Sequence, residues 1–176
     1  MWPPARPRSA TGRALGDRIY TAGVLYAAIA LQWLHILAGL AWFGSSIFIL
    51  FVMVPAVRRL SPDAAGEYLR ALEATSKVFF PVVGVLTIVL GIVRGLLLGV
   101  APGSPYGNTY LAAVILGIAL LVYGALVTGR NVQRMGTAAA GPEQEAALDR
   151  TVRFGYIELT GFLLLLVLMV AMRFGY

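Results

Sequence analysis

The sequence predicts an all-α integral membrane protein whose four helices form an antiparallel bundle in a single domain. Hydrophobic residues make up 59% of the 176 residues and charged residues only 12%. Soluble domains carry about 25% charged residues, so a water-soluble globular protein is excluded. Crossing a bilayer core takes about 20 apolar residues, and the chain holds blocks of that length. The expected spans are 22–55, 79–100, 109–129 and 155–174.

The first block is longer than one crossing requires, so its helix is expected to tilt or to project beyond the membrane. Residues 1–21 precede it as an Arg- and Pro-rich tail, and residues 2–9 of this tail, which read WPPARPRS, have a composition typical of irregular or disordered structure. A cleaved signal peptide is not expected, because the apolar block is far longer than the about 7–15 residues of a signal sequence.

The connections between the blocks predict the orientation in the membrane. Residues 56–77 and 130–154 hold four basic residues each, and residues 101–108 hold no charged residue. Basic loops stay in the cytoplasm, so the first and third connections are expected inside and both termini outside. The basic N-terminal tail favours the opposite orientation. The net charge of +6 therefore reflects membrane topology, and no nucleic-acid partner is expected.

Helix starts are expected within both basic connections. Ser61 and Pro62 open a short amphipathic helix. Gly141 and Pro142 open a helix that continues into the fourth span.

Glycines recur along the later spans at intervals that allow close contact between helices, and the same small-residue seams would serve a homodimer. They are Gly84, Gly91, Gly95 and Gly99 in the second span, Gly117 and Gly124 in the third, and Gly161 in the fourth.

His35 is the most informative residue, since it is the single histidine and the chain has no cysteine. An ionisable side chain within a membrane span is costly and indicates function by default. Gly39 and Trp42 share its helical face, and Gly39 leaves room there for a flat or bulky group. The alternative is that His35 only hydrogen-bonds to a neighbouring helix.

A helical rise of 1.5 Å per residue places Arg94, Met169 and Met172 at the depth of His35, near the outer face. The site is expected between the first, second and fourth helices. Imidazole with thioether sulfur suits a copper ion as Cu(I). Imidazole alone or with an axial Met suits haem b, with Arg94 neutralising a propionate. The alternatives are that Arg94 extends to the membrane interface and that the methionines only pack against lipid or core.

Glu158 lies at the opposite end, a few residues into the fourth span. It is expected to pair with Arg153, Arg130 or Lys77, and a proton or cation relay is the alternative. Aromatic residues near the span ends are expected only to anchor the helices at the interface. They include Trp33, Tyr106, Tyr110, Tyr156 and Tyr176.

Residues 33–44, which read WLHILAGLAWFG, resemble the first helix of the copper resistance protein D domain family. Residues 80–91, the Tyr106-Gly107 pair and residues 150–159 agree with that family, and the resemblance covers about residues 30–175. The layout is also similar to that of the bacterial membrane protoporphyrinogen oxidase that binds haem b.

The resemblance implies a cell-membrane protein of copper handling or transport, with His35 as a copper ligand or axial haem ligand. It also implies that Glu158 is the family's acidic residue at the start of the fourth helix. Both families place a Lys early in the third helix, where this chain has Leu111, Ala112 and Ala113, so a non-enzymatic role is favoured. The alternatives are a haem b-binding oxidoreductase or electron-transfer subunit, and a ligand-free accessory subunit. A redox or copper-carrying partner protein is expected with the metal centre.

Overall fold

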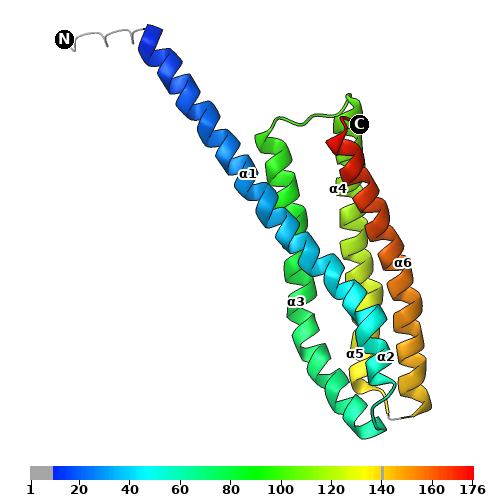
Figure 1. Ribbon diagram of the computed structural model, residues 1–176. Coiled ribbons are helices and arrows are strands. Elements are labelled where there is room, and N and C mark those ends of the chain that lie inside the picture. Colours follow the sequence, from blue (N-terminus) through cyan, green and yellow to red (C-terminus); the bar gives the residue numbers. More distant parts are fainter. Residues whose placement is uncertain (1–9, 140) are drawn as a thin grey trace, which may run out of the picture.

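The computed structural model describes residues 10–139 and 141–176, with side chains from residue 22 onward. All regular elements within these ranges are helical, and they form four antiparallel rods (Figure 1). The elements are α1 Ala10–Phe48, η1 Ile49–Met53, α2 Val54–Val57, α3 Pro62–Leu97, α4 Pro105–Tyr123, η2 Gly124–Thr128, α5 Gly129–Thr137 and α6 Pro142–Arg173. The all-α four-helix bundle expected from the sequence is thus confirmed.

The four rods are long and apolar enough to cross a membrane. They are Ala22–Val57, Pro62–Leu97, Pro105–Thr137 and Pro142–Arg173. Large apolar side chains such as Leu37, Val82 and Leu164 lie more than half exposed on the outside of the bundle. Length, composition and this apolar surface describe a multi-pass membrane protein in contact with lipid.

The first helix projects from one end of the bundle, as its excess length predicted (Figure 1). We call this the upper end; it also carries the C-terminus and the α3–α4 connection. The lower end carries the other two connections. Helix α1 begins at Ala10, so it includes the second part of the Arg- and Pro-rich tail, and the irregular structure expected for residues 2–9 stays a prediction. Residues 1–9 lie outside the described residues.

The short amphipathic helix and the second span are one continuous helix, α3, where two elements were expected. Pro62 occupies the first turn of α3 and Ser61 its N-cap position, without a capping hydrogen bond from the side chain. The helix ends at Leu97, and Gly99 follows with φ +67°, a left-handed conformation that favours glycine. Gly99 therefore terminates the helix, and its expected packing role is wrong. The continuity of α6 from Pro142 into the fourth span is confirmed.

Other glycines hold the helices close together within the chain. A Cβ atom on Gly84 would lie 2.7 Å from Leu121 Cδ1, and one on Gly161 would lie 2.5 Å from Leu120 Cδ2. Gly95 lies against the phenol ring of Tyr110. The seams predicted from the sequence are thus occupied inside the bundle.

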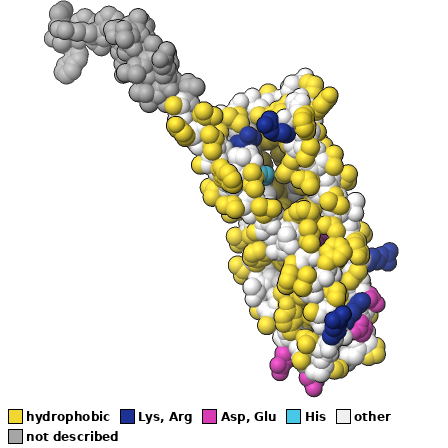
Figure 2. Space-filling model, viewed as in Figure 1, with side chains coloured by type: hydrophobic (Ala, Val, Ile, Leu, Met, Phe, Trp, Pro, Cys, Tyr) yellow, Lys and Arg dark blue, Asp and Glu magenta, His cyan; other side chains and the backbone are white. Residues whose placement is uncertain are grey.

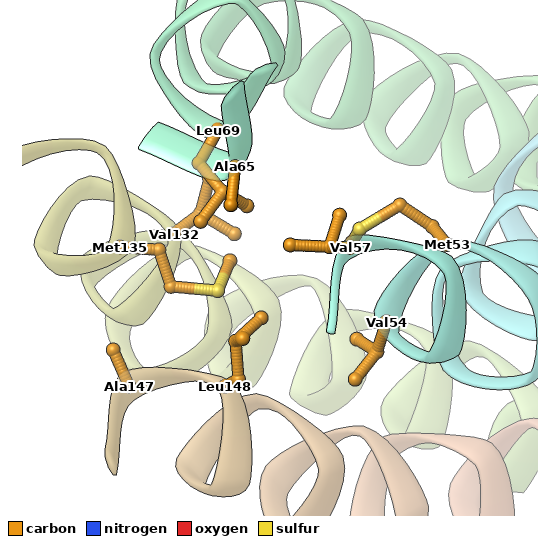
Figure 3. Close-up of a cluster of buried hydrophobic side chains, with 9 residues drawn as sticks. All are labelled: Met53, Val54, Val57, Ala65, Leu69, Val132, Met135, Ala147 and Leu148. Atoms are coloured by element: carbon orange, nitrogen blue, oxygen red, sulfur yellow. The ribbon is translucent and has the colours of Figure 1, made fainter. Parts of the chain in front are cut away.

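Two hydrophobic clusters hold the bundle and frame its cavities. In the lower cluster, side chains from the η1–α2 segment, α3, α5 and α6 point toward one another (Figure 3). The upper cluster surrounds Trp42, whose ring meets the ring of Phe162 edge-on with 5.0 Å between centroids. Such edge-to-face pairs contribute about 0.5–1.5 kcal/mol beyond their buried area. Trp42 also lines both cavities described below, so it lies at their boundary.

Candidate functional site

The imidazole of His35 is held in a fixed orientation between α1 and α3. Its Nδ1 lies 2.7 Å from the backbone oxygen of Thr87. A carbonyl oxygen can only accept, so Nδ1 donates the proton. In the neutral ring this leaves the lone pair on Nε2, the nitrogen available to a metal. The ring therefore has the arrangement of a metal-ligating histidine whose second nitrogen is bonded to backbone.

Gly91 makes the space that the imidazole occupies. It lies one turn beyond Thr87 on the same face of α3, and a Cβ atom there would lie 3.0 Å from Cε1 and 3.1 Å from Nδ1 of His35. Those separations are shorter than ordinary van der Waals contact. A larger residue at this position would push the ring away from the Thr87 carbonyl.

His35 lines an upper cavity of about 610 Å³. Figure 2 shows the histidine in a hollow of the surface, with basic side chains at its edge. The volume is within the range of about 300–1,000 Å³ that small-molecule and cofactor sites occupy. The residues expected at this site all line the cavity, namely His35, Gly39, Trp42, Arg94, Met169 and Met172.

Helix α4 forms a further wall of the cavity, which was not expected from the sequence. The cavity was expected between the first, second and fourth spans, but Tyr106, Tyr110 and Gly117 of α4 also line it. The tyrosines that were expected only at the interface therefore border the site. The Tyr110 hydroxyl lies 3.4 Å from the backbone oxygens of Gly91 and Ile92, on the helix that carries the histidine's partner.

Arg94 brings an unpaired donor to this cavity. Its Nε is buried and has no hydrogen-bond partner, and no ion pair to Arg94 occurs among the residues with described side chains. A buried N–H without an acceptor costs about 1–3 kcal/mol, and more when the group is charged. Arg173, at the end of α6, lines the same cavity. The upper part of the cavity thus offers two cations to an anionic group.

Other parts of the site carried weak sequence signals. Thr87 acts through its backbone oxygen, which no side-chain pattern reveals. Gly91 was interpreted only as a packing glycine. Arg173 follows the last apolar block and resembles an ordinary interfacial cation. One signal was available in the sequence: Thr87 and Gly91 lie one helical turn apart, so one face of α3 has room for a ring such as the His35 imidazole.

The donor set for a metal is nitrogen and thioether sulfur. Within the described part of the chain, no group of three or more His, Asp or Glu side chains could hold a metal ion. His35, Met169 and Met172 remain as donors on the upper cavity.

Glu158 lies in a second, lower cavity of about 230 Å³. Its side chain is 5% exposed, and Oε2 accepts a hydrogen bond of 2.9 Å from the Thr128 hydroxyl. The expected ion pair to Arg153, Arg130 or Lys77 is wrong, since none of the described ion pairs includes Glu158. Lys77 instead bonds to Glu73 at 2.6 Å, one turn away on its own helix.

Comparisons of the chain with protein-family models, with curated proteins and with solved structures found no match.

Proposed function

We propose that the protein is a haem b-binding membrane protein that transfers electrons, with the haem held in the upper cavity by His35. The observation that carries this proposal is the orientation of the imidazole. Its Nδ1 is fixed on a backbone oxygen of α3, and the ring lies on a cavity of about 610 Å³. Axial histidines of haem proteins have this arrangement of one anchored and one free nitrogen.

The rest of the cavity supports a flat, amphiphilic cofactor with acidic groups. Gly39, Gly91 and Gly117 present walls without side chains, and Trp42 and Phe162 add apolar surface. Arg94 and Arg173 would bind the propionates, and the buried Nε of Arg94 would gain its missing acceptor.

Haem b, when bound, supplies one-electron transfer between ferrous and ferric iron. The chain's own residues set the conditions for that chemistry. The Thr87 carbonyl holds the ring and raises the basicity of its ligating nitrogen. The apolar walls exclude water, which controls the reduction potential. Met169 or Met172, which line the same cavity, would help to hold the group through a thioether sulfur.

Copper handling is the second candidate, favoured by the two thioethers beside His35 and by the resemblance to the copper resistance protein D domain family. A Cu(I) ion is bound by soft donors of this kind. It would leave most of the cavity unfilled and the arginines without a role, so the haem proposal accounts for more of the site.

The absorption spectrum of the detergent-purified full chain distinguishes these candidates. We expect a Soret band and about one haem per chain in a pyridine haemochrome assay, with weaker haem binding in Arg94→Gln. Arg153→Gln is the matched control, because this exposed arginine lines neither cavity. A colourless chain that retains one Cu(I), lost in a Met169→Leu, Met172→Leu double variant, would support copper. A chain that binds neither would overturn both proposals and leave the accessory-subunit alternative.

We further propose that the protein lies in the cell membrane with its lower end in the cytoplasm. Residues 56–77 and 130–154, which form the lower connections and the adjoining parts of the helices, carry four basic residues each, and residues 98–104 of the upper connection carry no charge. Because the chain has no cysteine, Ala101→Cys and Ala139→Cys give single reporters on exposed connections at opposite ends. An impermeant maleimide added outside intact cells should label Cys at 101 alone. Labelling at position 139 alone would show that the protein has the opposite orientation in the membrane.

A homodimer and a redox or copper-carrying partner protein stay predictions. Chemical crosslinking of membranes followed by denaturing electrophoresis tests both, since a dimer doubles the chain mass and a partner adds a different mass.

A further inference from the structure

The lower cavity is bordered by the two irregular segments of the bundle. Ile49 and Leu50 of η1 and Gly124, Ala125 and Thr128 of η2 all line it. Both segments are π-helical, a conformation that is rare and frequently occurs at functional sites. The wider π-helical turn at Gly124 faces the carboxyl group of Glu158, since a Cβ atom there would lie 3.3 Å from Oε1.

The Glu158 carboxylate has no cationic partner among the described side chains. A buried carboxylate is costly unless it is paired and hydrogen-bonded. Thr128 donates to Oε2, and no hydrogen bond to Oε1 occurs in the described part of the chain. Lys77 is the basic residue that lines the cavity, and its ammonium group is already bonded to Glu73. The cavity therefore presents a buried carboxyl group that no cation from the described side chains pairs with.

The other walls indicate what kind of cation fits. Trp42 and Phe80 supply aromatic surface, and the hydroxyl-bearing residues Ser46 and Ser76 lie among mostly apolar neighbours. A hard metal cation such as Ca²⁺ takes about six to eight oxygen ligands, more than one carboxylate and a few hydroxyls provide. An organic ammonium ion fits both the carboxyl group and the walls of the cavity. Its charged group is attracted to the carboxyl group and to aromatic faces, and its apolar part packs against the apolar walls.

We propose that the lower cavity binds a small organic ammonium ion, with Glu158 accepting its N–H groups and Trp42 and Phe80 contacting its apolar part. The cavity of about 230 Å³ is below the range of about 300–1,000 Å³ typical of drug-sized ligands. The ligand is therefore small, with a single ring or a short aliphatic chain. This site shares the Trp42 side chain with the upper cavity, but Glu158 does not line the cavity of His35.

Isothermal titration of the detergent-purified full chain with benzylammonium chloride tests the proposal. We expect one saturable site in the wild type and a loss of at least about tenfold in affinity in Glu158→Gln, as for a hydrogen bond to a charged group. Glu67→Gln is the matched control, because Glu67 is exposed, lies outside the cavity and loses the same charge. Benzyl alcohol, of similar shape but uncharged, should not bind at this site in any variant.

A second variant covers the case in which Glu158→Gln fails to fold. Gly124→Ala keeps the carboxylate and narrows the cavity beside Oε1, so it should also weaken benzylammonium binding. The proposal is overturned if the wild type shows no saturable binding, if benzyl alcohol binds as well as benzylammonium, or if both variants bind like the wild type. An unchanged Soret band in Glu158→Gln would show that the two sites are independent.

Discussion

Replacing Gly91 with alanine should weaken haem binding without weakening the fold. The new Cβ atom would lie 3.0 Å from Cε1 and 3.1 Å from Nδ1 of His35, so the ring must move by a few tenths of an ångström. That movement acts directly on the Nδ1 contact of 2.7 Å to Thr87. Losing an outer-shell partner of a metal ligand typically reduces metal affinity by about 10–100-fold. The same substitution improves helix propensity by about 0.8–1.0 kcal/mol, which offsets the about 0.5–1.5 kcal/mol of a weakened hydrogen bond, so stability should change little while haem affinity falls.

Haem titration of purified protein, followed at the Soret band, measures the affinity. Gly44→Ala is the matched control, because Gly44 lies on the same helix as His35, lines neither cavity and has no atom within 4 Å of a Cβ. We expect Gly91→Ala to bind haem about tenfold or more weakly and Gly44→Ala to bind haem with the affinity of the wild type. Equal affinities in Gly91→Ala and the wild type would refute the role assigned to the anchored imidazole.

Three further substitutions test the packing. Gly155→Ala should destabilise the protein by about 1–3 kcal/mol in detergent unfolding, because the Cβ atom would lie 2.5 Å from Leu50 Cδ2. Its control is Gly44→Ala, which should leave stability unchanged because Gly44 is exposed and has no atom within 4 Å of a Cβ. Asn131→Ala should cost about 1–3 kcal/mol by the same measurement, because its 2% exposed amide bonds to the Ala147 oxygen at 3.2 Å and to the Thr151 hydroxyl. Arg58→Ala, which breaks exposed ion pairs to Glu145 and Asp149, should change stability by less than about 1 kcal/mol; a larger loss would show that these pairs are not screened by solvent.

The bundle could be predicted from the sequence because membrane spans follow from local composition. Each apolar block needs only its own length and hydropathy to predict a helix, and the connections needed only charge and turn residues. The boundary between connection and span could not be predicted in α3, because its polar first half and its apolar second half form one unbroken helix. Pro81, a residue type that often interrupts helices, lies near the junction without ending α3, and membrane-spanning helices tolerate proline at such positions.

Helix periodicity and depth in the membrane were enough to predict which side chains lie together at the upper site. His35, Arg94 and the two methionines were expected in one layer, and they line one cavity. The partner of His35 was not predictable, because a backbone oxygen has no sequence signal. The ion pair expected for Glu158 failed for a related reason. Lys77 has a carboxylate one turn away on its own helix, and a local partner requires less ordering than one on another helix.

Chemical rescue of His35→Gly by imidazole tests the central claim most directly. Removing the side chain leaves space for free imidazole in the same cavity. Because free imidazole can replace the ligand but not the covalent link to α1, the experiment distinguishes a ligand role of His35 from a structural role. We expect the purified variant to bind no haem alone and to regain a 1:1 Soret spectrum when imidazole is added. A His35→Gly variant that binds haem as tightly as the wild type without imidazole would contradict the account.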